Sequence, residues 1–265
     1  MFKIKMFARK KQYETCISVS LDEPLTSDSC SKLIMEFIKY ILYEKEQIPF
    51  SFDTLTELQT RLKPNDKNAS STKTVLAALR NISENLTSQL HTNGCEVREV
   101  IVIIGATMLS PKLCVRLELP QEILNSRCHM EYQHSSRKPL LNLMRSIVEC
   151  EEFQEAMTVP LGVTNTFVLL QKSDSNPTSD FFLPKPQYIP PTQATTCFAI
   201  KFRQNSSEVV NCHCKNVIKI YHDFPQIIHE NNDSHNDYNS KERQHNYPYL
   251  WYQSREVIKG FKFIR

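Results

Sequence analysis

The densest group of potential metal ligands is a cysteine–histidine–cysteine sequence followed by three separated histidines. Its members are Cys212, His213, Cys214, His222, His229 and His235. A structural zinc site usually takes its ligands as Cys-x2–4-Cys and His-x3–5-His pairs, because a loop of that length bends both ligands toward one tetrahedron. A Cys-x-Cys spacing in a strand points both sulfur atoms to one face, which permits zinc binding but is unusual. We therefore favour packed strand cysteines and expect no metal.

The local sequence does not pair a nucleophile with a base. The chain has nine cysteines and eight histidines, but no cysteine stands in a motif that selects one histidine as its base. Neither HExxH nor GxSxG occurs, and the adjacent carboxylates Glu151 and Glu152 fit a solvated helix edge. We expect no catalytic residues and no enzymatic activity.

Phosphate-binding loops require closely spaced glycines, and this chain has few. Its four glycines are Gly94, Gly105, Gly162 and Gly260. They lie too far apart to form GxGxxG or GxxxxGK[ST], so we do not expect a nucleotide-binding enzyme of the common kinds. No cofactor is expected.

Charge and hydropathy indicate neither a nucleic-acid partner nor a membrane. The 32 basic and 29 acidic residues give a net charge of +3, which is too balanced to predict nucleic-acid binding. The longest apolar run, VIVII at residues 100–104, is too short to span a bilayer, and no signal-peptide pattern follows the basic start. The nine cysteines lack paired spacing, so we expect a reducing compartment, cytosolic or nuclear.

Hydrophobic periodicity predicts helices and strands in one α+β domain. Helices are expected from Asp28 or Ser29 to before Pro49, over 52–62, over 74–90 and over 136–156. Strands are expected at 16–21, in a hairpin over 97–119 with its turn at Ser110 and Pro111, and at 164–171, 196–202 and 208–221. The segments 63–72 and 173–191 should be irregular. We predict helices covering one face of a mostly antiparallel sheet.

The helix predicted over 136–156 has more apolar surface than packing on a sheet requires. Leu140, Leu143, Ile147 and Cys150 form one side. At 100° per residue, Leu141, Met144 and Val148 extend the apolar surface to about half the circumference. Another element of the chain must cover this extra face, or it binds a partner.

Three blocks of the sequence resemble the comet family of spindle-checkpoint adaptors. They are FIKYILYEKEQIPFSFDTL at 37–55, VREVIVIIGATMLSPKLCVRLEL at 97–119 and LWYQSREVIKGFKF at 250–263. Their order and spacing extend the resemblance from residue 29 to the C-terminus. It implies a HORMA-like domain, in which three main helices pack on a mostly antiparallel sheet and a C-terminal segment wraps the sheet like a safety belt.

The resemblance also implies partners and a role. Members of this family bind the closed conformer of the mitotic-arrest-deficient protein two, block recruitment of its open form and present it to a hexameric AAA+ remodelling ATPase. This activity silences the spindle assembly checkpoint and permits mitotic exit, without catalysis by the adaptor. The implied localisation is the nucleus and cytoplasm, with the spindle in mitosis. Neither nucleic acid nor a membrane is an implied partner.

Carried over position by position, the resemblance predicts a partner-binding surface and a belt. The predicted partner-binding residues are Tyr43, Glu44, Gln47, Leu141, Met144, Arg145 and Val148. The predicted belt residues are Trp251, Tyr252, Lys259, Gly260 and Phe261. The sequence departs from the family at Met144, where an aromatic residue is usual, and at Glu44, where glutamine is usual.

The belt interpretation fits the pattern of the C-terminal segment. Leu250 and Tyr252 alternate with Trp251, and apolar residues resume after SRE, so two short extended pieces are expected, with a bend at Gly260. We predict a single domain over 1–265, with a flexible basic N-terminus (1–14), a mobile polar loop (229–246) and the belt (247–265). A nucleic-acid-binding protein or another HORMA-type scaffold, using the basic ends, is the alternative.

Overall fold

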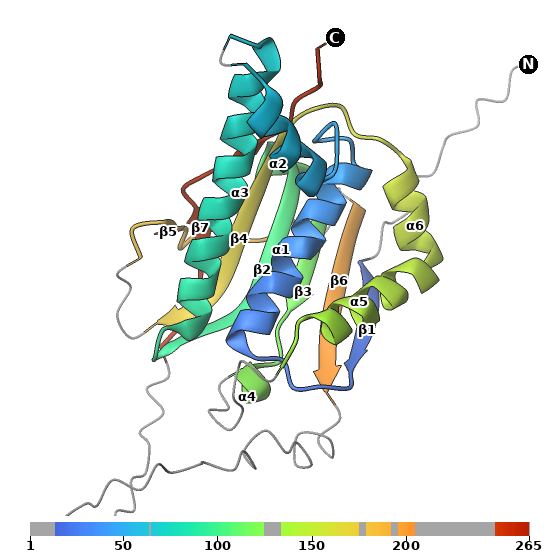
Figure 1. The fold of residues 1–265 in the computed structure, drawn as a ribbon. Helices are drawn as coiled ribbons and strands as arrows, with labels where there is room; N and C mark the ends of the chain where they lie inside the picture. Colours follow the sequence, from blue (N-terminus) through green and yellow to red (C-terminus); the bar gives the residue numbers. More distant parts are fainter. Residues whose placement is uncertain are drawn as a thin grey trace, which may run out of the picture.

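The computed structural model describes residues 14–63, 65–124, 134–174, 179–191, 196–204 and 247–264. Within these residues, helices lie on one face of an eight-stranded mixed sheet (Figure 1). The helices are α1 (Ser27–Glu44), α2 (Phe52–Arg61), α3 (Lys67–His91), α4 (Gln121–Leu124), α5 (Arg137–Glu149) and α6 (Glu151–Thr158). The strands are β1 (Thr15–Leu21), β2 (Cys95–Thr107), β3 (Ser110–Glu118), β4 (Asn165–Asp174), β5 (Phe182–Pro184), β6 (Thr196–Gln204), β7 (Leu250–Ser254) and β8 (Ile258–Lys259).

The sheet order is β1-β6-β3-β2-β4-β7-β5, and β8 also pairs with β4. β6 runs parallel to both β1 and β3, whereas the other pairings are antiparallel. The predicted α+β architecture and the mostly antiparallel sheet are therefore confirmed. The strand predicted at 208–221, the loop at 229–246, the Cys212–His213–Cys214 sequence and the basic N-terminus before residue 14 lie outside the described residues.

The central strand β2 is buried on both faces, as its continuous apolar run indicates. Val100, Val102 and Ile104 face the main core under the helices. Ile101 and Ile103 face a smaller apolar cluster on the opposite side of the sheet, which also contains Trp251. Both faces of the sheet are therefore shielded from solvent at β2.

The helix boundaries differ from the sequence prediction where side-chain caps decide them. α1 begins after Thr26, whose hydroxyl accepts from the Ser29 N–H in a capping box, so neither Asp28 nor Ser29 is the cap. α3 begins after Asp66, whose carboxylate accepts from the Asn68 N–H at 2.7 Å. Residues 67–72 of the segment predicted as a loop consequently belong to α3.

The single helix predicted over 136–156 is broken at Cys150, which has extended φ and ψ of −87° and 103°. In an unbroken helix Phe153 would point about 120° around the axis from Ile147, away from the side that faces the core. The break instead turns Phe153 into the core, where it contacts the rings of Phe37 and Phe198 at centroid distances of 6.3 and 5.0 Å. Burial of this ring stabilises the break.

Two connections were also predicted differently. The proline-rich segment 173–191 contains the short strand β5, which forms the edge of the sheet beside β7. The β2–β3 turn lies at 108–109, one residue before the predicted Ser110 and Pro111, which already belong to β3.

Candidate partner-binding surface

α5 attaches to the domain by one side and exposes the other. Leu143 and Ile147 are fully buried in the main core. The side chain of Asn142 donates to the Ser20 carbonyl at 3.1 Å and to the Asp22 carboxylate at 3.0 Å, which fixes the helix to the end of β1. A helix held in this way presents its opposite side in a defined orientation.

The exposed side of α5 carries the predicted extra apolar residues. The side chains of Leu141 and Val148 are 55% and 60% exposed, and Arg145 between them is exposed. Met144 is half-buried and packs partly on the main core. We define the α5 surface as Arg137, Leu141, Arg145, Val148 and Glu149, which are all exposed.

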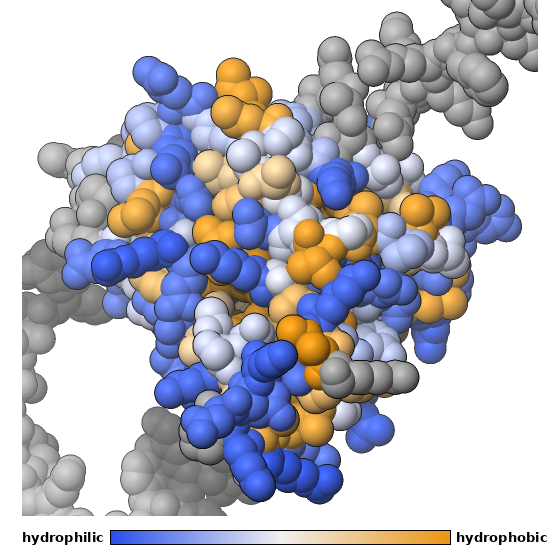
Figure 2. Space-filling view, turned by 90° about the horizontal axis from the view of Figure 1, so that it is seen from above, coloured by the Kyte–Doolittle hydropathy of each residue, from blue (hydrophilic) through white to orange (hydrophobic). Residues whose placement is uncertain are grey.

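The α5 surface has an ordered charge pattern as well as an apolar centre. Arg137 begins α5 and Arg145 lies just past its middle, whereas Glu149 ends α5 and Glu152 follows at the start of α6. A binding partner would match it best with a helix of the opposite charge order. Other surface hydrophobic residues are interspersed with hydrophilic ones, as on the end of the molecule shown in Figure 2.

The C-terminal end of α1 supplies two further predicted residues. Tyr43 is 49% exposed and Glu44 is half-buried. Tyr40 lies one turn before Glu44 on α1. Burial raises the pKa of Tyr40, and the negative charge of Glu44 raises it further, whereas a hydrogen bond with Gln154 of α6 lowers it. Glu44 therefore lies near the side of α1 that borders α6.

Gln47 does not belong to a partner-binding surface, because its side chain is fully buried. Its Oε1 atom accepts from the Thr164 N–H at 2.9 Å, and its Nε2 atom donates to the carbonyls of Lys45 (2.9 Å) and Leu161 (3.2 Å). Glu46, with a φ of 52°, turns the chain after α1 so that Gln47 points inward. Gln47 thus has a structural role in place of the predicted one.

Lys45 is a structural residue that sequence reasoning missed. It is buried, and its Nζ atom donates to the Ala156 carbonyl and, at 2.5 Å, to the Val159 carbonyl. These carbonyls end α6 and lack helical partners, so the ammonium group caps the helix. Burial lowers the pKa of Lys45. A lysine after a helix is common on surfaces, and no local pattern marks this one as buried.

Two of the predicted belt residues, Trp251 and Tyr252, lie on β7, one strand in from the edge of the sheet. β7 pairs with both β4 and β5, which places Trp251 and Tyr252 on opposite faces, in the smaller and the main core respectively. β5 occupies the outer edge of the sheet beside β7. The two extended pieces predicted for the segment are present as β7 and β8.

Past β8, the C-terminal segment is tied to the helices. The N–H groups of Gly260 and Phe261 donate to the carbonyls of Thr164 and Gln47, both at 2.9 Å. Phe261 is partly buried against the core, while Lys259 is exposed. Asn68 of α3 exchanges two hydrogen bonds with the backbone of Ile264 at 2.8 and 2.9 Å. The segment crosses the domain from the sheet to the start of α3.

Other kinds of site find no support in the part of the chain that the structure describes. No group of three or more His, Cys, Asp or Glu residues in it could hold a metal ion. No helix among the described residues is long and apolar enough to cross a membrane.

Helices on one face of a mixed sheet, with C-terminal strands inserted beside β4, define a HORMA-like domain. The model of the p31comet family, described as "Mad1 and Cdc20-bound-Mad2 binding", matches residues 8–201. This match covers more than half of the chain, and the chain belongs to the p31comet family. It ends before β7, so the resemblance of the C-terminal segment to the family stays a prediction.

The chain is also similar to two curated proteins. The MAD2L1-binding protein of Homo sapiens is 25% identical over 189 residues, and that of Mus musculus is 24% identical over 187 residues. Each alignment covers 67% of this chain and 66% of the relative. The chain thus matches just under two thirds of the length of these relatives.

Proposed function

We propose that this chain is a non-enzymatic adaptor that binds the closed conformer of Mad2, the mitotic-arrest-deficient protein two, through the α5 surface. The observation that carries the proposal is the pair of exposed apolar side chains, Leu141 and Val148, on a helix whose other side is anchored in the core. The family description and the names of both relatives support Mad2 as the partner.

The chemistry of the α5 surface supports the docking of a helix. Leu141 and Val148 are seven residues apart, so they lie two turns apart on nearly the same face of the helix. Arg145 between them and Arg137 one turn before Leu141 can pair with carboxylates of a partner. Such a surface combines an apolar centre with a charged rim, the usual arrangement in protein interfaces.

Tyr43 and Glu44 extend the proposed contact to the end of α1. Tyr43 offers an exposed aromatic ring, a residue type favoured at interfaces. Glu44 offers a carboxylate where the family usually has glutamine, so we propose a basic group opposite it on the partner. The half-buried position of Met144 makes it a support for the surface more than an anchor inserted into Mad2.

We further propose the steps that follow binding. The adaptor would block recruitment of open Mad2, present closed Mad2 to a hexameric AAA+ remodelling ATPase and so silence the spindle assembly checkpoint, permitting mitotic exit. The nucleus and cytoplasm, and the spindle in mitosis, are the proposed locations. One domain over the whole chain also remains a proposal. Family membership supports these steps as an inference from relatives.

A pull-down with conformer-locked Mad2 tests the proposal. The full chain should retain Mad2 locked in the closed form and not Mad2 locked in the open form. The variant Leu141→Glu should lose retention, because a carboxylate would be buried in the apolar centre of the interface. Glu84→Lys, which changes an exposed residue on α3, is the control and should bind like the unmodified chain. Equal retention of both conformers, or none of either, would refute the proposal.

A further inference from the structure

Two cysteines lie directly opposite each other on the face of the sheet that the helices do not cover. Cys114 on β3 and Cys197 on β6 are register partners in a parallel pair. Both are buried free thiols within the smaller apolar cluster. Backbones of neighbouring strands are about 4.8 Å apart, within the Cα separation of about 4.4–6.8 Å that a disulfide requires.

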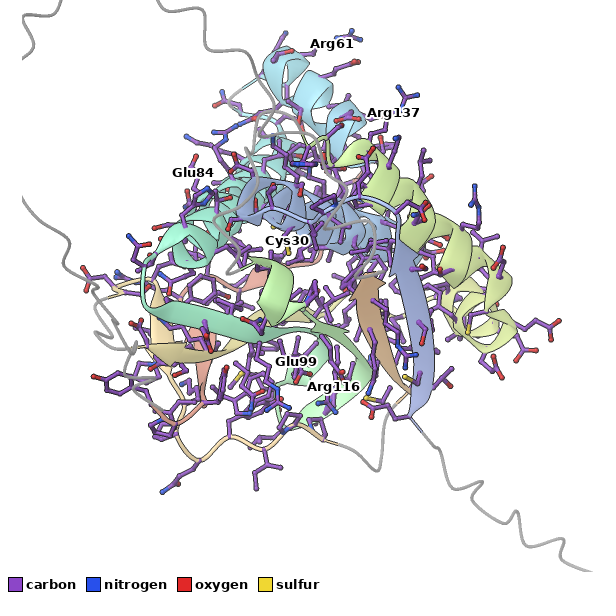
Figure 3. The ribbon with its side chains drawn as sticks, turned by 90° about the horizontal axis from the view of Figure 1, so that it is seen from below. Cys30, Arg61, Glu84, Glu99, Arg116 and Arg137 are labelled. Atoms are coloured by element: carbon purple, nitrogen blue, oxygen red, sulfur yellow. The ribbon has the colours of Figure 1, made fainter. Side chains whose placement is uncertain are left out.

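The other buried cysteines of the described residues are not arranged in this way. Cys30 lies on α1, between the helices and the sheet (Figure 3), and Cys95 begins β2 opposite Asp174. Burial raises the pKa of Cys30 to about 12, and its place on a helix gives it no cross-strand register partner. The cross-strand pair therefore differs from its neighbours in geometry.

Charged groups lie beside the pair. The Cys197 thiol donates to Oε1 of Glu14 at 3.6 Å. Arg116 forms ion pairs with Glu14 at 3.0 Å and with Glu99 at 2.5 Å, and Figure 3 shows Glu99 and Arg116 close together on this face. A hydrogen bond from the Cys114 thiol lowers the pKa of Cys197, and burial and Glu14 oppose this effect. The same bond raises the pKa of Cys114.

We propose that Cys114 and Cys197 form an oxidation site, which hydrogen peroxide converts to an intrachain disulfide. The Cys197 sulfur attacks one peroxide oxygen and gives up its proton. The O–O bond breaks, and the departing hydroxide takes up the proton, leaving a sulfenic acid and one water. The Cys114 sulfur then displaces the sulfenic oxygen, which leaves with the Cys114 proton as a second water. The two thiols together lose two electrons, and these reduce one peroxide molecule to two waters.

The position of the bond indicates its effect. α5 packs on β1, β1 pairs with β6, and β6 joins the remaining sheet through β3. A Cys114–Cys197 disulfide would therefore fasten the edge that carries α5 to the centre of the sheet. Because the bond also restricts the unfolded chain, the oxidised protein should melt at least about 2 °C higher than the reduced protein.

Mass spectrometry on the unmodified full chain tests this site directly. The folded protein is treated with hydrogen peroxide, remaining thiols are blocked in denaturant, and the chain is digested without reductant. A linked peptide pair containing Cys114 and Cys197 is expected, and a reducing agent should abolish it together with the rise in melting temperature. No linked pair, or links that join these residues to other cysteines at similar yield, would overturn the proposal.

Variants separate this disulfide from other oxidation. Cys114→Ala and Cys197→Ala should each lose the peroxide-dependent rise in melting temperature, whereas Cys30→Ala should keep it. Alanine remains compatible with an apolar site, so the reduced variants should still fold. A rise that persists in both pair variants would contradict the assignment even if a linked peptide were found.

Discussion

Gly260 shows how one residue can join distant parts of this fold. A Cβ atom at this position would lie 2.8 Å from Oε1 of the buried Gln47 side chain and 3.0 Å from the carbonyl oxygens of Gln47 and Thr164. Gly260→Ala should therefore destabilise the protein by about 1–3 kcal/mol, since two of the three clashing atoms are backbone. Chemical denaturation of the purified variant measures this change.

Gly162 provides a matched control for that substitution. A Cβ atom there would meet nothing within 4 Å, so Gly162→Ala should change the free energy of unfolding by less than about 1 kcal/mol. Equal effects of the two substitutions would show that Gly260 is not packed as described. The sequence predicted only a bend at Gly260, because the approach of Gln47, over 200 residues earlier, leaves no local pattern.

Tyr249 should make the folded chain less stable as the pH becomes alkaline. Burial, followed by a hydrogen bond at 2.7 Å to Glu96, raises its pKa from 10.0 to about 12. Because the folded pKa is the higher one, this stabilisation is complete below pH 10 and is lost as pH rises toward 12.

The variant Tyr249→Phe isolates this contribution. Denaturation between pH 9 and 12 should show a shallower loss of stability in the variant than in the unmodified chain, since phenylalanine does not ionise. Tyr252 and Cys95, whose pKa values are also raised, remain in both proteins and cancel in the comparison. Parallel pH profiles would refute the assignment to Tyr249.

Among the elements, the C-terminal strands are the ones whose place in the sheet the sequence predicted least. Alternation of apolar residues predicted two extended pieces, and β7 and β8 confirm them. The place of β7 between β4 and β5 depends on pairing with segments far away in sequence, which a local pattern does not encode. The same holds for the break at Cys150, which follows from the burial of Phe153 against Phe198.

Removal of residues 250–265 should therefore abolish the native fold. The truncation deletes the strand between β4 and β5 and takes the buried side chains of Trp251, Tyr252 and Ile258 out of both cores. The exposed edge of β4 would then favour aggregation or pairing between chains. Circular dichroism and size-exclusion chromatography measure the result, and a truncated chain that stays monomeric and equally stable would contradict it.

At the scale of the whole molecule, composition and periodicity were sufficient for the α+β class and for most helices and strands. The apolar run of β2 and the stripe of α1 are strong local signals, and both are confirmed. The candidate surface was predicted less completely. Leu141 and Val148 are exposed as expected, but Gln47 is buried and the buried Lys45 was not predicted. The chain turns inward at Glu46, and this turn depends on packing in three dimensions.

The central claim is that the α5 surface contacts closed Mad2, and isothermal titration calorimetry tests it most directly. The full chain is titrated with Mad2 locked in the closed form, and the double variant Leu141→Glu/Val148→Glu is compared with the control Glu84→Lys. Both changed positions are more than half exposed, so the double variant should keep the melting temperature of the unmodified chain. We predict at least about a 100-fold loss of affinity for the double variant, equivalent to about 2.8 kcal/mol, and none for the control. Tight binding that the folded double variant retains would contradict the claim.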